Sequence, residues 1–186
     1  ELDHHTLVLP TYWDEHFESI FDAPGWPDNP AYYVNVPSQT DPTAAPDGKE
    51  TLVVLVPIAP GLEDDESARE QMREEILDSL AEHAGIDLRD SIEFEREMCV
   101  SEYRSQFNKP QGTALGLAHT LFQTGPMRPS HRAPGVDRLY YVGGDTNPGI
   151  GVPMCLLSGE HVAETIEGDA TDSGVIDGLL PGRLRS

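Results

Sequence analysis

The segment from Leu139 to Pro153 constrains the fold of this chain more than any other part. It begins with an apolar run that ends at Gly143 and Gly144, and Asp145 follows directly. An apolar run that stops at two glycines predicts a buried strand, followed by a turn whose backbone can lie close to another group. Pro153 suits the first position of a helix, because its missing N–H group would have no partner there. The segment therefore predicts a strand, a glycine turn that carries one acid, and the start of a helix.

This arrangement suits a ligand that carries or gains negative charge. In open α/β sheets, ligands bind at the carboxyl ends of the strands, which is where Asp145 is expected. The unpaired N–H groups and the positive dipole end of the helix stabilise negative charge, and a flavin gains such charge at its N1/O2 edge when it is reduced. The alternative is a strand–turn–helix whose glycines serve only tight packing. The predicted cofactor-binding residues are Gly143, Gly144, Asp145, Gly151, Val152, Pro153 and Met154.

Acidic residues dominate the charge of the chain. There are 33 Asp and Glu residues against 12 Lys and Arg, which gives a formal net charge of −21, and Lys49 and Lys109 are the only lysines. Such a surface is typical of proteins that work in molar salt, where the Debye length falls to about 3 Å at 1 M. The alternative is an acidic protein whose charge keeps it soluble. We predict a halophilic source and no nucleic-acid partner, because a surface this negative repels phosphates.

Other kinds of site find little support in the sequence. Cys99 and Cys155 stand alone, and no histidine has zinc-ligand spacing with either of them, so no metal site is predicted. Ser158 lies outside the G-x-S-x-G pattern of a hydrolase, and no residue is predicted to be an obligatory catalytic acid or base. Two isolated thiols and no signal peptide favour the cytoplasm. No apolar run reaches the roughly 18 residues of a membrane span, whereas attachment at the membrane surface stays compatible with the sequence.

Periodicity predicts a mixed α/β chain. The clearest helix covers Glu66–Ala84 and ends at Gly85, because the apolar residues of this range recur on one face. The continuous apolar run at 51–56 predicts a strand in the centre of its sheet. The apolar stripe of the helix consists of Ala68, Met72, Ile76, Leu77, Leu80 and Ala84. Further strands are expected at 4–9, 31–36 and 91–100, with shorter helical segments at 13–21 and 101–107 and a helix after Pro153 that reaches Ile166.

Five blocks of sequence, in order along the chain, share motifs with one family. The blocks are His4–Leu7; Ile20–Phe21 with Asp28–Asn35; Asp41–Gly48 with Leu52–Pro57; Gly112–Leu117 with Arg128–Pro129; and Leu139–Gly159. They resemble the carotenoid (phytoene) desaturase family, which is FAD-dependent. Asn147 departs from the usual His, and Asp145 stands where many members have Gly. Asp145 thereby restores the Gly-Asp pair with which other FAD enzymes bind the ribityl chain.

The resemblance implies a domain organisation. Residues 1–125 would belong to a substrate-binding mixed β-sheet domain, 126–170 to the returning strand and helix of a Rossmann-type FAD-binding domain, and 171–186 to a C-terminal tail. No G-x-G-x-x-G turn is present, so we expect this chain to be the C-terminal part of a longer enzyme. Its acidic charge predicts that this enzyme is haloarchaeal. The FAD pyrophosphate site would then lie in the N-terminal remainder.

The implied activity is FAD-dependent desaturation of an apolar isoprenoid such as phytoene. Two alternatives stay open. The first is another flavin oxidoreductase, of the amine-oxidase or retinol-saturase type, that shares the C-terminal flavin motif. The second is a binding or assembly module without catalysis.

Overall fold

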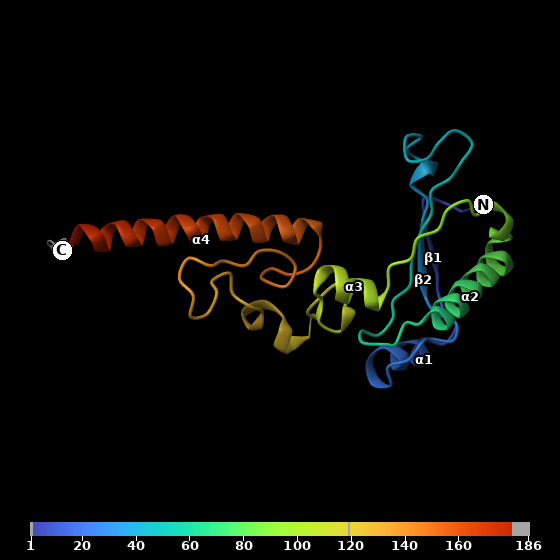
Figure 1. Ribbon diagram of the computed structural model, residues 1–186, viewed down its shortest axis with the longest axis horizontal. Coiled ribbons are helices and arrows are strands. Elements are labelled where there is room, and N and C mark those ends of the chain that lie inside the picture. The colour runs from blue at the N-terminus through green and yellow to red at the C-terminus, as the bar shows by residue number, and fades with distance from the viewer. Residues whose placement is uncertain (1, 119, 180–186) are drawn as a thin grey trace. The chain divides into compact units, whose positions relative to one another are not determined.

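The computed structural model describes residues 2–118 and 120–179, and its described part is mixed α/β, as predicted (Figure 1). The chain divides into two compact units, Glu1–Ala114 and Leu115–Ser186, which are called here the N-terminal unit and the C-terminal unit. The sheet lies in the N-terminal unit, and the long helix α4 lies in the C-terminal unit. Among the described residues, no helix combines the length and the apolar character needed to cross a membrane.

An antiparallel sheet of three strands forms the centre of the N-terminal unit. Its strands β1 (His5–Val8), β2 (Tyr32–Asn35) and β3 (Val53–Leu55) follow the order β1-β2-β3. The strands expected in these three regions are therefore confirmed. The predicted central place of the apolar run 51–56 is wrong, because β2 is central and β3 pairs with β2 alone. All three β3 residues are exposed, whereas Leu52 and Val56 beside them pack against the core, so the run is not buried on both faces.

The helix α2 (Glu66–Ala84) has the predicted bounds and covers one face of the sheet (Figure 1). It begins where the Asp65 side chain accepts a hydrogen bond from the Ala68 N–H at 2.9 Å, and it ends at Gly85, which adopts a φ of 67°. Leu80 of its apolar stripe packs with Val34 of β2. The core cluster consists of Leu2, Tyr32, Val34, Val36 and Leu80.

Two shorter helical segments complete the N-terminal unit. The helix α1 (Trp13–Phe17) continues as a π-helix over Glu18–Asp22, and α3 spans Val100–Phe107, which confirms both predicted segments. The strand predicted over 91–100 is wrong, because this stretch has no strand partner and its first residue, Ser91, is the last residue of a short 3-10 turn (Arg89–Ser91). Its alternating acids instead bind basic side chains elsewhere: Glu95 pairs with Arg73 of α2 at 2.9 Å. The alternating acidic residues therefore reflect these ion pairs and do not indicate a half-buried strand.

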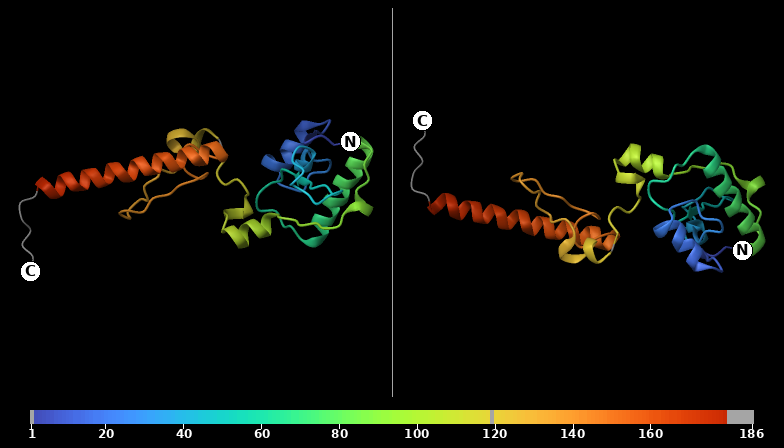
Figure 2. Two further views of the ribbon diagram at one scale, coloured as in Figure 1. Left: turned by 90° about the horizontal axis from the view of Figure 1, so that it is seen from above. Right: turned by 90° about the horizontal axis from the view of Figure 1, so that it is seen from below.

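The C-terminal unit contains loops, short 3-10 turns and the helix α4 (Val152–Leu179), which begins one residue before Pro153 and runs beyond Ile166. The loop before α4 runs alongside the helix in both views of Figure 2. The buried strand predicted at Leu139–Val142 is wrong, because only Tyr140 forms a bridge, to Arg132. A single bridged pair does not provide the series of inter-strand hydrogen bonds that a strand requires. Within the predicted tail, α4 continues through residue 179, and 180–186 lie outside the described residues.

Replacing the central core residue of the N-terminal unit tests this packing. Leu80→Ala is expected to lower the free energy of unfolding by about 2–5 kcal/mol, because it leaves a cavity beside Val34. Leu7→Ala on the exposed part of β1 serves as the control and should change this free energy by less than about 0.5 kcal/mol. Urea unfolding at constant molar salt measures both values. Equal losses in the two variants would contradict the placement of the core.

Candidate cofactor site at the glycine turn

The glycine turn has a backbone that only glycine adopts readily. Gly143 has a φ of 114° and Gly151 a φ of 122°, a region that L-residues with side chains rarely occupy. A Cβ atom added to Gly143 would meet nothing within 4 Å, so the space beside it is open. A Cβ atom on Gly144 would lie 3.5 Å from Ile150 Cγ1 and 3.9 Å from Cys155 Sγ. The turn therefore packs against the start of α4 on one side and leaves backbone accessible on another.

Two buried hydroxyl groups tie this turn to α4. The Ser158 side chain is fully buried, and its Oγ accepts a hydrogen bond from the Gly143 N–H at 2.9 Å. Thr146 Oγ1 lies 3.0 Å from Ser158 Oγ and donates to the Gly143 carbonyl at 2.9 Å. Because buried polar groups are costly without partners, this network fixes the turn on the helix. Ser158 has a structural role here, in agreement with the absence of a nucleophile motif.

The predicted Asp145 lies against a second turn that contains Gly116. Asp145 Oδ1 accepts a hydrogen bond from the Leu117 N–H at 3.2 Å. Gly116 adopts a φ of 75°, and a Cβ atom there would lie 1.9 Å from Asp145 Oδ1. The absence of a side chain at Gly116 is therefore what allows the carboxylate to approach. Two of the sequence blocks, 112–117 and 139–159, meet at this contact.

The start of α4 supplies the remaining predicted residues. Its first intrahelical hydrogen bond runs from the Cys155 N–H to the Gly151 carbonyl at 2.8 Å. The N–H groups of Val152 and Met154 precede it and Pro153 has none, so two donors stand at the positive end of the helix dipole. The contact of Gly144 with Ile150 and Cys155 holds this helix start beside the glycine turn. The structure thus brings the residues of the glycine turn, 143–145, next to those of the helix start, 151–154. Their role in cofactor binding stays a prediction.

The predicted cofactor-binding set does not include Arg128, the residue that joins these loops. Arg128 is only 3% exposed and donates hydrogen bonds to the backbone carbonyls of Gln123 at 2.9 Å and Gly144 at 2.6 Å. It also reaches the carbonyls of Thr146 at 3.1 Å and Leu117 at 3.4 Å. In the sequence, its place in an Arg-Pro motif and its position near the loop before the predicted strand indicated a positioning or capping role. Thr146 and Ser158 gave no comparable signal, because buried hydroxyls are recognised only from their surroundings.

Farther along α4, an ion pair between Arg132 and Asp169 binds the preceding loop to the helix. The Arg132 guanidinium binds Asp169 through Nη2–Oδ1 at 2.7 Å and Nε–Oδ2 at 3.0 Å, and the Tyr140 hydroxyl donates to Asp169 Oδ2 at 2.7 Å. Hydrogen bonds from Arg132 and then from Tyr140 lower the pKa of the Asp169 carboxyl to about 2. The same carboxylate raises the pKa of Tyr140. This clamp holds the bridge residues 132 and 140 against the helix.

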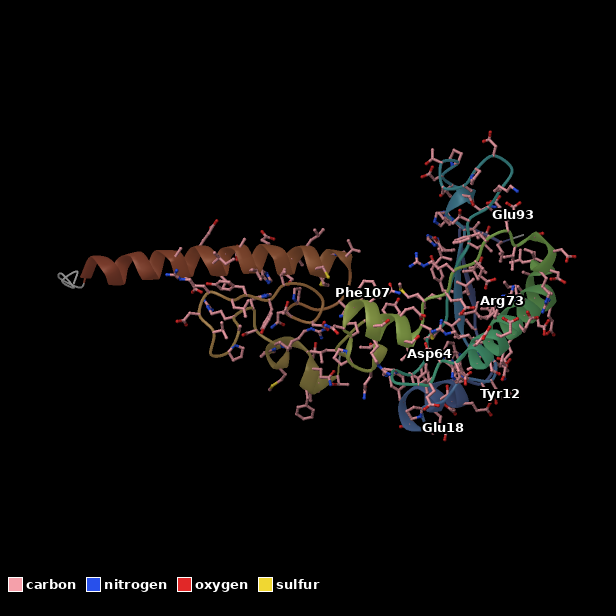
Figure 3. The ribbon with its side chains drawn as sticks, viewed as in Figure 1. Tyr12, Glu18, Asp64, Arg73, Glu93 and Phe107 are labelled. Carbon is pink, nitrogen blue, oxygen red and sulfur yellow. The ribbon has the colours of Figure 1, made fainter. Side chains whose placement is uncertain are left out.

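In the N-terminal unit, Asp64, Arg69, Glu97 and Glu102 line an acidic hollow, and their contacts have a structural role. Asp64, labelled in Figure 3, accepts hydrogen bonds from Arg69 Nη2 at 2.7 Å and from the Ser101 N–H at 2.9 Å. Burial raises the pKa of the Asp64 carboxyl, but the hydrogen bonds from Ser101 and Arg69 outweigh it and leave the pKa lowered. Glu102 binds Arg69 at 2.8 Å, which lowers the pKa of Glu102. These contacts join the starts of α2 and α3.

No metal site accompanies either unit in the part of the chain that the structure describes. There, no three His, Cys, Asp or Glu side chains gather closely enough to hold an ion. The rings of His131 and His161 have centroids 6.1 Å apart, and His131 Nδ1 lies 3.1 Å from the Tyr141 carbonyl. His131 therefore packs against the loop that precedes the glycine turn.

The Asp169 clamp predicts a defined pH dependence. Because the folded pKa of Asp169 is about 2 and its ordinary value is 3.8, the clamp stabilises fully above about pH 4 and is lost as the pH falls through about 2. Asp169→Asn is therefore expected to lower the unfolding temperature at neutral pH, and its gap from the wild type should close at low pH. Circular dichroism at constant molar salt measures the gap. The exposed Asp137→Asn is the control; a gap that persists at about pH 2 would contradict the clamp.

Comparison with known proteins shows similarity to carotenoid desaturases, whereas no family model matches the chain. A carotenoid 3,4-desaturase from Haloarcula japonica is 58% identical over 165 residues, which cover 89% of this chain and 33% of that protein. A phytoene desaturase from Fusarium fujikuroi is 32% identical over 203 residues, covering 97% of this chain and 35% of that protein. A zeta-carotene-forming phytoene desaturase from Myxococcus xanthus is 35% identical over 179 residues, with 94% and 34% covered.

The chain spans about a third of the length of these relatives. At 97% coverage, the similarity nevertheless extends over both compact units. Over the segment that it shares with these proteins, the chain is similar to carotenoid desaturases, which confirms the resemblance drawn from its motifs.

Proposed function

We propose that the chain is part of an FAD-dependent oxidoreductase that desaturates an apolar carotenoid precursor such as phytoene. The observation that carries this proposal is the 58% identity to a carotenoid 3,4-desaturase over 89% of the chain. The donor set of the glycine turn and helix start fits the polar edge of a flavin, because both N–H donors and close backbone approach are present. The FAD pyrophosphate would be held by an N-terminal remainder of the enzyme.

Within this proposal, each predicted site residue has a role. Asp145 would accept a hydrogen bond from a ribityl hydroxyl, and the N–H groups of Val152 and Met154 would stabilise negative charge at the flavin edge. Gly143, Gly144 and Gly151 allow the backbone to come close, and Pro153 shapes the helix start. When bound, FAD would accept a hydride from a substrate C–H bond, while the neighbouring carbon loses a proton and a new C=C bond forms. The chain's own contribution is to orient the cofactor and stabilise its charge.

The uncovered face of the sheet supports an apolar substrate. Leu7 of β1, Tyr33 of β2 and Leu55 of β3 stand side by side in the register, on the face opposite the one that α2 covers. Leu7 and Leu55 are 67% and 57% exposed, which is unusual for a row of large apolar side chains. We assign this face to the substrate-binding domain, where it would contact an isoprenoid chain.

A second apolar surface supports peripheral attachment to a membrane. The rings of Trp13, Phe17 and Phe21 follow one another along α1 and the π-helix, with centroids 5.5 Å and 6.2 Å apart. All three are exposed, as is Tyr12, which is labelled in Figure 3. Aromatic side chains of this kind favour the interface between lipid and water. We propose a cytoplasmic enzyme that contacts the membrane surface, where apolar substrates dissolve; the free thiols of Cys99 and Cys155 agree with a reducing compartment.

The function test uses the full-length protein that carries this chain. The wild type is expected to retain flavin through gel filtration and to convert phytoene in liposomes to products with more conjugated double bonds, followed by absorbance. In Asp145→Ala, FAD affinity should fall about ten- to a hundredfold, because a charge-assisted hydrogen bond of roughly 1.5–3 kcal/mol is lost. Gly151→Val should also weaken binding, because its φ of 122° excludes a β-branched residue.

Glu63→Ala, an exposed acid before α2, is the control and should leave FAD affinity unchanged. Fluorescence titration gives the dissociation constants. Full flavin retention in both the Asp145 and Gly151 variants would mean that the turn serves packing alone. Bound flavin without phytoene turnover would indicate another flavin oxidoreductase, and a full-length protein without flavin would indicate a binding module.

We also infer that the protein works in molar salt. The formal net charge of −21 supports this inference. So does the pairing pattern among the described residues, where each of three arginines in the N-terminal unit contacts three carboxylates. Arg89, for example, contacts Glu74, Asp78 and Asp87. Acidic side chains outnumber basic ones, so the repulsion among carboxylates must be screened by salt.

Stability should therefore rise with salt concentration. The thermal unfolding midpoint of the protein is expected to increase strongly between low salt and about 3 M KCl, because screening shortens the Debye length to a few ångströms. Differential scanning fluorimetry at neutral pH measures the midpoint. Sucrose at matched water activity is the control for exclusion effects and should raise the midpoint less. A midpoint that stays flat across the KCl series would rule out halophilic adaptation.

A further inference from the structure

Arg128 is a buried cation with an unusual set of partners. Its guanidinium donates to four backbone carbonyls, those of Leu117, Gln123, Gly144 and Thr146. None of the ion pairs among the described residues includes Arg128. A charge that is 3% exposed must be compensated by hydrogen bonds, so the carbonyls are held where the guanidinium needs them.

The planar fork of arginine is what makes this arrangement possible. Arginine presents five N–H donors in fixed directions, whereas the lysine ammonium is a point charge with three donors on a flexible stem. Here Nε reaches Thr146, Nη1 reaches Gln123, and Nη2 reaches both Gly144 and, more weakly at 3.4 Å, Leu117. One side chain thus fixes two loops relative to each other.

The Asp145 carboxylate lies where these two loops, 117–123 and 144–146, meet. Asp145 lies between Gly144 and Thr146, whose carbonyls both bind Arg128. Its Oδ1 accepts from the Leu117 N–H, and the Leu117 carbonyl is bound by the same guanidinium. Arg128 therefore controls both the backbone that carries Asp145 and the backbone that orients its carboxylate.

We propose that Arg128 is a positioning residue of the cofactor site: by binding the Gly144, Thr146 and Leu117 carbonyls, it fixes the Asp145 carboxylate in the orientation that receives the ribityl chain of FAD. This inference rests on the proposed flavin function. Arg128 acts through Asp145 and does not itself contact the cofactor. Its contribution to FAD binding should therefore disappear when Asp145 is absent, whereas a contribution to folding would persist.

The test is a double-mutant cycle in the full-length protein at about 3 M KCl. Arg128→Lys keeps the charge but loses the fork, and it should lower FAD affinity about tenfold. Asp145→Ala combined with Arg128→Lys should bind FAD no more weakly than Asp145→Ala alone. Dissociation constants come from fluorescence titration, and visible circular dichroism of the bound flavin should change in Arg128→Lys. Thermal unfolding of each apoprotein separates folding from binding.

Gly116→Ala reaches the same carboxylate while Arg128 stays intact, and it serves if Arg128→Lys does not fold. The added Cβ atom would lie 1.9 Å from Asp145 Oδ1, so FAD affinity should fall, and again no further once Asp145 is alanine. Arg104→Lys, at an exposed position of α3, is the matched control and should bind FAD like the wild type.

The outcomes distinguish this inference from the function on which it rests. Wild-type affinity in Arg128→Lys, or losses that add in the double variant, would overturn the positioning role even though the wild type binds flavin. A folded Gly116→Ala variant with wild-type affinity would overturn it as well. A full-length wild type that retains no flavin would overturn the proposed function and this inference together.

Discussion

Hydrogen bonds from buried side chains to backbone groups hold the C-terminal unit together. Arg128 binds carbonyls of two loops, and Ser158 and Thr146 bind the glycine turn. Among the described residues of the loops before α4, a single bridge is the only strand-like pairing, so sheet hydrogen bonds cannot supply this order. Because each of these polar side chains is buried, leaving any of them unpaired costs more than an exposed hydrogen bond contributes. The candidate cofactor site inherits its geometry from this network.

The N-terminal unit depends on a different interaction. There an amphipathic helix covers one face of a small antiparallel sheet, and its apolar stripe supplies the core. Arginines on α2 bind acids from the segments that follow, such as Glu95 and Glu102, and so fasten irregular chain to a regular helix. In a chain with so few bases, Arg69, Arg73 and Arg89 each pair with three acids and so join irregular segments to α2.

Large apolar side chains remain exposed in both units. Leu7 and Leu55 lie on the open face of the sheet, and Val152 and Leu156 lie on α4. Neighbouring exposed apolar side chains of this kind often mark interaction surfaces. The chain spans about a third of its relatives, so surfaces that are open here are the places where an apolar substrate, a membrane or further protein would be accommodated under the proposed function.

The sequence by itself determined the mixed α/β class, the helix α2 with both of its ends, and the three regions that form strands. These features rest on local periodicity and capping, which neighbouring residues decide. It also placed the glycines whose positive φ angles the turn requires. Tertiary structure alone decided that β2 and not β3 is central, that 91–100 and 139–142 are not strands, and that Arg128, Thr146 and Ser158 support the site. Strand formation and the burial of polar groups depend on partners far away in the chain, and no local pattern records which partners those are.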